Sequence, residues 1–194
     1  MGDLDGEVYR WVGEHRTGWL DPFFIALTVA GYAGLLWVAL AIALPLLARR
    51  RPTVVFAVTA LAVWSVDLFV QILKELIHRP RPFEEISDPE PLTTLAVSYS
   101  LPSGHAATSF AGAVVLSYFF PRAAPWLLLL ATAVAYSRVY IGVHYPGDVV
   151  AGAAIGAAWG VAAVLVYSTV RTRRARAARR LGRREARAYS ERAP

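Results

Sequence analysis

Three short polar clusters interrupt an otherwise apolar chain, and they carry side chains suited to anion binding, acid–base and nucleophilic chemistry. The clusters occupy residues 74–82, 102–105 and 137–148. Together they supply three fixed cations, two histidines, one carboxylate, a serine and a glycine: Lys74, Arg81, Arg138, His105, His144, Asp148, Ser103 and Gly104. Whether these groups form one site depends on the elements that carry them.

The cations and a helix start predict a site for a tetrahedral dianion. Lys74, Arg81 and Arg138 bring positive charge, while Ser103 and Gly104 stand where an apolar helix begins. Serine can cap that helix, and glycine lets an anion approach the free N–H groups of the first turn. Each residue alone is better explained as a boundary charge or a cap. The combination points to phosphate.

The two histidines differ in their neighbours, which predicts different roles for them. His144 and Asp148 are four residues apart, so a helical turn brings the carboxylate beside the imidazole. Such a carboxylate fixes the tautomer of the ring and stabilises its cationic form. His105 has no carboxylate at helical spacing. Two titrating groups in unlike surroundings are how acid and base roles are divided.

The composition indicates a membrane protein rather than a soluble or disordered one. Of 194 residues, 56% are apolar and 18% charged, below the roughly 25% charged residues of soluble domains. There is no cysteine, which excludes disulfide frameworks, thiolate metal sites and cysteine nucleophiles. Residues 171–194 hold ten Arg and two Glu, so the rest of the chain carries a net charge of −2. A basic tail on a near-neutral apolar body does not indicate a nucleic-acid binder.

The pattern predicts an all-α, polytopic transmembrane helix bundle. Five apolar runs are long enough, or nearly so, to cross a bilayer, which takes about 20 residues: 22–48, 53–73, 105–120, 124–142 and 148–170. An amphipathic amino-terminal helix would make six helices in all. We therefore expect an interfacial segment at 1–21, a transmembrane domain at 22–170 and a basic cytoplasmic tail at 171–194.

The distribution of Arg predicts the orientation in the membrane. Residues 49–51, Arg122 and the tail all fall on one side if the five spans alternate, and Lys and Arg favour the cytoplasm. The three polar clusters then face the outside, together with the acidic residues 1–21. The tail either lies on anionic lipid or is a solvated stop-transfer anchor.

At this point the clusters resemble the three signatures of the type-2 phosphatidic-acid phosphatases, a family whose superfamily includes vanadium-dependent haloperoxidases and glucose-6-phosphatases. The matching motifs are Lys74-x6-Arg81-Pro82, Pro102-Ser103-Gly104-His105 and Ser137-Arg138-x5-His144-x3-Asp148. The resemblance covers about residues 22–170. Membrane members of the family usually have six spans, one more than we expect here.

The resemblance implies a metal-independent phosphatase with a phosphohistidine intermediate and no cofactor. His144 would attack phosphorus, oriented by Asp148, and His105 would protonate the leaving oxygen and then activate water. The phosphoryl oxygens would be held by Lys74, Arg81, Ser103, Gly104 and Arg138. No metal ligand and no nucleic-acid partner is expected. The protein would be a bacterial, multi-pass plasma-membrane enzyme with its active site on the extracytoplasmic side.

The favoured substrate is undecaprenyl or another polyprenyl diphosphate, hydrolysed to the monophosphate in cell-wall lipid metabolism. Phosphatidylglycerol phosphate and phosphatidic acid are the alternatives. A transporter or flippase would use the same cations to bind a lipid phosphate without cleaving it. The histidine–carboxylate pair favours chemistry over transport, and a haloperoxidase-like activity is disfavoured because the chain is embedded in a membrane.

Three further features have two interpretations each. Asp67 lies two helical turns before Lys74 and either orients it or makes a structural contact. Arg79, beside the first cluster, either meets the second phosphoryl group of a diphosphate or takes no part in the site, and we do not assign it to the site. Glycines recur every four residues at 152–160, a spacing that favours packing inside the bundle over a dimer seam.

Overall fold

The computed structural model describes residues 2–49, 51–93 and 98–190, and it confirms an all-helical fold. The helices run in the order α1 (Gly2–Glu14), α2 (Asp21–Ala30), η1 (Tyr32–Gly34), α3 (Leu35–Leu47), α4 (Thr53–Ile77), α5 (Pro82–Glu85), α6 (Gly104–Phe119), η2 (Pro121–Ala123), α7 (Ala124–Tyr140) and α8 (Pro146–Ser190). There are more helices than the six expected, because the first apolar run is divided and the long connection after α4 contains the short α5.

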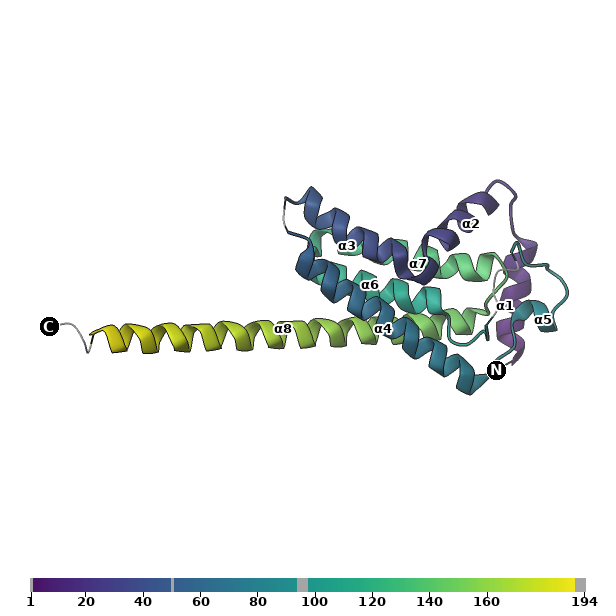
Figure 1. Cartoon of the computed structure of the whole chain (residues 1–194). Helices are drawn as coiled ribbons and strands as arrows, with labels where there is room; N and C mark the ends of the chain where they lie inside the picture. Colours follow the sequence, from purple (N-terminus) through teal and green to yellow (C-terminus); the bar gives the residue numbers. More distant parts are fainter. Residues whose placement is uncertain (1, 50, 94–97, 191–194) are drawn as a thin grey trace.

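Helix α6 is the centre of the bundle and packs against α4, α7 and α8 (Figure 1). Its buried residues are mostly small, among them Ala107, Ala111 and Gly112, so neighbouring backbones approach closely. A Cβ added at Gly152 or Gly156 of α8 would collide with the α6 backbone at Ser103 or Ala107. The glycine stripe therefore packs inside the bundle.

The first apolar run is not one straight span. It breaks between α2 and α3, whose axes differ by 51°. At the break, Ala33 and Gly34 have positive φ angles of 50° and 71°. A Cβ at Gly34 would collide with Val63 of α4, so glycine allows the bend to press against that helix. The bend brings Tyr32 and Ala33 towards the polar clusters.

Only part of the five-span expectation is supported. Among the described residues, the helices beginning at Thr53 and Pro146 are long and apolar enough to cross a membrane, and the bent α2–α3 pair would make a third span. Helices α6 and α7 have 16 and 17 residues, or about 24–26 Å at 1.5 Å per residue. That is shorter than the roughly 30 Å hydrocarbon core. The number five stays a prediction.

The bundle has a polar end and a basic end. Helices α4 and α7 end, and α6 and α8 begin, where the three polar clusters lie, and α1 and α5 sit at that end (Figure 1). The α3–α4 turn, η2 and the tail part of α8 are consequently at the opposite end. Helix α1 turns Tyr9 and Val12 inward, 0% and 5% exposed, and leaves Trp11 exposed. It is amphipathic, as expected, and packs on α7 and α8.

Candidate active site

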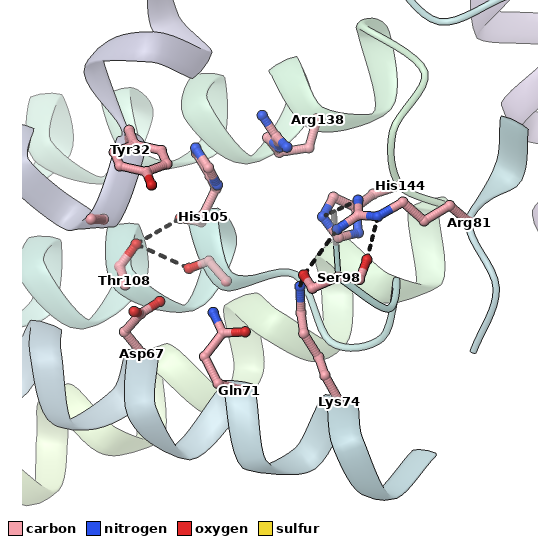
Figure 2. Close-up of a pocket in the computed structure, with 12 residues that line it drawn as sticks. Tyr32, Asp67, Gln71, Lys74, Arg81, Ser98, His105, Thr108, Arg138 and His144 are labelled. Carbon is pink, nitrogen blue, oxygen red and sulfur yellow. Dashed lines mark hydrogen bonds between the residues drawn. The ribbon is translucent and has the colours of Figure 1, made fainter. Parts of the chain in front are cut away.

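The three clusters converge on one cavity of about 290 Å³ at the polar end (Figure 2). It is bounded by α4, α6, α7, η1 and the α7–α8 connection. Six of the residues singled out from the sequence line it: Lys74, Arg81, Gly104, His105, Arg138 and His144. The other two, Ser103 and Asp148, are fully buried behind the lining. The structure therefore brings all eight residues to one region.

The three cations are held by backbone and hydroxyl oxygens rather than by carboxylates. Arg81 donates from Nε to the Ser98 carbonyl at 2.6 Å and from Nη1 to the Val143 carbonyl at 2.7 Å. The Lys74 ammonium donates to Ser98 Oγ at 3.1 Å. Both cations are almost fully buried, 3% and 4% exposed. Within the part of the chain that the structure describes, neither cation forms an ion pair with a carboxylate, so their charges remain available to an anion.

Two buried polar atoms beside the cavity have no hydrogen-bond partner among the described residues. These are Nε of Arg138 and Oγ of Ser103. Ser103 occupies the N-cap position of α6 as expected, but its hydroxyl makes no capping bond, so that part of the expectation is wrong. Nearly all buried polar groups in proteins are paired. Two unpaired groups next to three cations and a helix start are suited to an oxyanion.

His144 lies in the α7–α8 connection, and its two ring nitrogens face different partners. Nδ1 is 3.4 Å from Asp148 Oδ2, and Nε2 is 3.3 Å from Arg81 Nη1. A carboxylate accepts and a guanidinium donates, which places the proton on Nδ1 and a lone pair on Nε2. The i, i+4 spacing thus yields the expected histidine–carboxylate pair, with Nε2 as the unprotonated nitrogen.

Burial and charge keep His144 neutral. Burial lowers the pKa of its imidazole well below the usual value, and the nearby cations Arg138, Arg81 and Lys74 lower it further. Burial also lowers the pKa of Arg81. A neutral imidazole with a free lone pair is the form that acts as a nucleophile.

His105, in the first turn of α6, has a different environment. Its Nε2 lies 3.2 Å from the carbonyl oxygen of Thr28 in α2, which can only accept, so Nε2 donates. Among the described residues, no carboxylate forms an ion pair with this ring. The same histidine lines a second, mainly apolar cavity between α2 and α7, of about 350 Å³. His105 therefore separates a polar space from an apolar one.

Arg79 has a role that the sequence did not reveal. Its guanidinium bridges two carboxylates, donating to Asp148 Oδ1 at 2.6 Å and to Asp5 Oδ2 at 2.8 Å. Its cationic centre also lies 4.2 Å from the ring centroid of Tyr145. Asp5 belongs to α1 and additionally accepts from the backbone N–H of Gly147 at 2.8 Å. The amino-terminal helix is thus attached to the carboxylate that orients His144.

Other contacts of the site were also missed. Ser100 donates a short hydrogen bond to Asp148 Oδ2, Ser98 connects Lys74 with Arg81, and Thr28 accepts from Arg138. All three are common residues, and Thr28 is more than 70 residues from the groups it meets. No periodicity or spacing connects them to the clusters. The serines immediately before residue 102 were the only available signal.

Comparison with known proteins places this arrangement in a family. A family model described as the PAP2 superfamily matches residues 53–172, more than half of the chain and all three polar clusters. The chain belongs to the PAP2 superfamily. The resemblance found in the three motifs is thereby confirmed, and helices α1 to α3 lie outside the matched PAP2 region.

Individual PAP2 relatives extend over most of the chain. The undecaprenyl-diphosphatase of Sulfolobus acidocaldarius is 29% identical over 84% of this chain and 78% of its own length. The lipid A 4'-phosphatase of Bacteroides thetaiotaomicron is 32% identical, covering 80% and 73%. The transmembrane PAP2-type phosphatidylglycerolphosphate phosphatase of Bacillus subtilis has a similar structure, with a TM-score of 0.73, 24% identity and 86% coverage of both chains. Each of the three is named as a phosphatase, and the last has the same fold as this chain.

Proposed function

We propose that this PAP2 protein is a membrane lipid phosphatase that acts through a phosphohistidine on His144. The observation that carries the proposal is the His144 imidazole, paired with buried Asp148, in a cavity lined by three cations. Phosphoryl transfer depends mainly on positioning and charge neutralisation, and these cations supply both. The proposed mechanism is therefore carried by protein cations.

In the first step, Nε2 of His144 attacks phosphorus and the bond to the leaving oxygen breaks. Asp148 accepts from Nδ1 and stabilises the positive charge that develops on the ring. His105, in its imidazolium form, gives its Nδ1 proton to the leaving oxygen and becomes neutral, while its Nε2–H stays on the Thr28 carbonyl. Lys74, Arg81 and Arg138, with Ser103 and the N–H of Gly104, hold the phosphoryl oxygens.

In the second step, His105 takes a proton from water as the water oxygen attacks the phosphohistidine. The P–N bond breaks, its electron pair returns to Nε2, and inorganic phosphate leaves. Dividing the displacement into two steps lets one acid–base group serve both. A hydroxyl group or a monophosphate stays on the lipid, depending on whether the substrate is a monoester or a diphosphate.

We propose that the active site lies at the extracytoplasmic surface of the membrane. Residues 22–170 form the catalytic bundle, α1 lies over its polar end, and the basic tail reaches the cytoplasm and its anionic lipids. Polyprenyl diphosphate is the substrate that the sequence favours, with phosphatidylglycerol phosphate and phosphatidic acid as alternatives. The relatives support lipid phosphates as a class, because their names include a prenyl diphosphate, lipid A and a phosphatidylglycerol phosphate.

A lipid transporter is the second candidate, and the geometry of His144 argues against it. Binding a phosphate requires cations and N–H donors, but it does not require an unprotonated nitrogen such as Nε2 of His144 among them. The Asp148–His144 pair instead places an unprotonated nitrogen next to Arg81, one of those cations.

The His144→Ala variant tests the proposal. Purified protein in detergent is offered polyprenyl diphosphate, phosphatidylglycerol phosphate and phosphatidate, and released phosphate is measured. The wild type should release phosphate from at least one lipid, whereas His144→Ala should lose at least about a thousandfold in kcat, as expected for a nucleophile. His15→Ala, which removes an exposed histidine of the chain, is the control. Undiminished turnover by His144→Ala would contradict the covalent mechanism.

A further inference from the structure

The cavity continues beyond the cations along α4. Past Lys74, its wall is formed by Gln71 and Asp67, with Thr108 of α6 facing them and Tyr32 of the α2–α3 bend above (Figure 2). Each of these side chains has a hydroxyl, carboxylate or amide group that can form hydrogen bonds, and none carries a positive charge. The cavity therefore has a cationic part and an adjoining uncharged or acidic part, which we call the polar arm.

The cavity is larger than a phosphate requires. Its volume of about 290 Å³ has room for roughly ten groups the size of a water molecule, at about 30 Å³ each. A phosphate has only five non-hydrogen atoms, so it leaves part of that space unfilled. The polar arm is the part that can receive the substrate atoms next to the phosphate.

Asp67 is the most informative residue of the polar arm. Its carboxylate forms none of the ion pairs found in the described part of the chain, although it lies within an apolar helix. One of its oxygens would be only 3.5 Å from a Cβ placed on Gly104, so it borders the phosphate-binding end of α6. A carboxylate at this depth is costly and marks a functional position. It would repel a second phosphate, and hydrocarbon offers it no hydrogen bond.

We propose that the polar arm binds hydroxyl groups on a polyol linker, a sugar or a glycerol, that joins the scissile phosphate to the rest of the lipid. This inference rests on the proposed phosphatase activity. Asp67 accepts hydrogen bonds from hydroxyls, as carboxylates do in ribose recognition. Gln71 both donates and accepts. The Thr108 hydroxyl donates to the Gly104 carbonyl at 3.0 Å, which leaves its oxygen lone pairs to accept.

The inference narrows the substrate class. A polyprenyl diphosphate and a phosphatidate have no free hydroxyl beside the phosphate, so they offer nothing to Asp67 and Gln71 beyond the hydrogen bond that these two side chains make to each other. A phosphatidylglycerol phosphate offers one hydroxyl, and a prenylphosphoryl pentose phosphate offers two on neighbouring carbons. A site built to bind a hydroxyl discriminates strongly against analogues that lack it. The polar arm thus favours substrates with a hydroxylated linker over the polyprenyl diphosphate that the sequence favoured.

The experiment compares kcat/KM for four lipids in the same detergent. These are farnesyl diphosphate, phosphatidate, phosphatidylglycerol phosphate and a prenylphosphoryl pentose 5-phosphate, the last also as its dideoxy analogue. The wild type should prefer the two hydroxylated lipids by at least about tenfold, and the pentose should lose that preference in its dideoxy form. Comparing phosphatidylglycerol phosphate with the pentose phosphate distinguishes recognition of a glycerol hydroxyl from recognition of sugar hydroxyls. Equal kcat/KM for the pentose and its dideoxy analogue would overturn the inference.

Variants at Asp67 separate recognition from folding. Asp67→Ala and the milder Asp67→Asn should each lower kcat/KM on the hydroxylated lipids about tenfold to a hundredfold, the effect of losing a hydrogen bond to a charged group. The same variants should change turnover of the dideoxy analogue less than about threefold. Glu75→Gln, which removes an exposed acid from the same helix, is the matched control.

The possible failures are distinguishable. If Asp67→Asn slows all substrates equally, Asp67 acts through Lys74 or through packing, and the inference is wrong while the phosphatase stands. If the wild type releases phosphate from none of the lipids, the proposed function itself is wrong.

Discussion

The Asp148 carboxylate is shared among four hydrogen-bond donors, and this sharing determines the protonation of His144. One oxygen accepts from Arg79, and the other from Ser100, the Tyr145 N–H and the His144 ring. A carboxylate already paired with a guanidinium stabilises an imidazolium less than a free one does. Arg79 therefore acts with the cations of the cavity to keep His144 neutral and ready to attack phosphorus.

Replacing Arg79 should shift the pH dependence of the enzyme. In Arg79→Gln, the full negative charge of Asp148 acts on His144 and raises its pKa from the lowered value towards the ordinary value of about 6.5. The imidazole is then protonated at a higher pH, so the acid limb of kcat/KM against pH moves to higher pH. Loss of one charged hydrogen bond to Asp148 should also reduce kcat by about tenfold. Profiles from pH 4 to 9 measure both effects.

Arg79→Lys keeps the charge and is the control for this shift. Its acid limb should stay with that of the wild type, even if the lost second contact to Asp5 lowers stability. If Arg79→Gln instead raised KM alone and left the pH profile in place, Arg79 would contact the substrate rather than Asp148, and the positioning role would be wrong.

Sequence reasoning identified the charged residues of the site but not what holds them. The eight residues selected from motif spacing all reach the cavity or the layer behind it, because order along a helical bundle largely determines which helix ends meet. Ser98, Ser100 and Thr28 were missed, and Asp5 is 143 residues from Asp148 in the chain. Those contacts depend on loop conformation and on where α1 docks, which no local pattern encodes.

At the scale of elements, the contact between α6 and α8 positions the phosphate-binding and acid–base residues of α6 relative to the carboxylate of α8 that orients His144. Helix α6 begins with Gly104 and His105, and α8 begins just before Asp148. The backbone N–H of Ser103 donates to the Asp148 carbonyl at 2.9 Å. The two helix starts are therefore fixed to each other, and the glycines of α8 allow the helices to remain in contact below that point.

Gly156→Ala should disturb this contact. The new methyl group collides with the backbone of Ala107, and neither helix can yield locally, so α8 must shift away from α6. We expect a loss of about 1–3 kcal/mol in the free energy of unfolding, typical of overpacking, together with reduced kcat as Asp148 moves from the start of α6. Thermal unfolding in detergent and initial rates measure the two effects.

Gly18→Ala is the matched substitution, because a Cβ there meets nothing within 4 Å. It should leave both stability and rate unchanged. A Gly156→Ala protein as stable and as active as the wild type would show that α6 and α8 are not held as closely as the structure indicates.

The helices themselves were largely predictable, with one informative failure. Four of the five apolar runs lie in helices that begin close to the expected residues, because each is bounded by proline, glycine or charge, although α8 continues beyond the fifth run to Ser190. The run at 22–48 has no charge, and its break at Gly31–Gly34 was overlooked. The glycines were the available signal. The bend follows from the packing of Gly34 against α4, a tertiary contact that hydropathy cannot report.

At the scale of the whole molecule, charge and chemistry are separated along the bundle axis. The cavity, the acidic α1 and the proline-rich connection lie at one end, and the α3–α4 turn and the basic tail at the other (Figure 1). Residues 171–178 of the tail are exposed. Basic flanks favour the cytoplasmic side. This polarity predicts that the cavity opens on the outer surface of the membrane, where a lipid enters from the bilayer.

Single cysteines test that orientation cleanly, because the natural sequence has none. Gly18→Cys marks the connection at the cavity end, while Ala48→Cys and Ala175→Cys mark exposed positions at the basic end without removing an arginine. A membrane-impermeant maleimide applied to intact cells should label the first variant and not the other two, which should react only after permeabilisation. The unmodified chain gives the background. Labelling of Ala48→Cys but not Gly18→Cys in intact cells would place the cavity in the cytoplasm and reverse the proposed topology, while leaving the chemistry of the cavity unchanged.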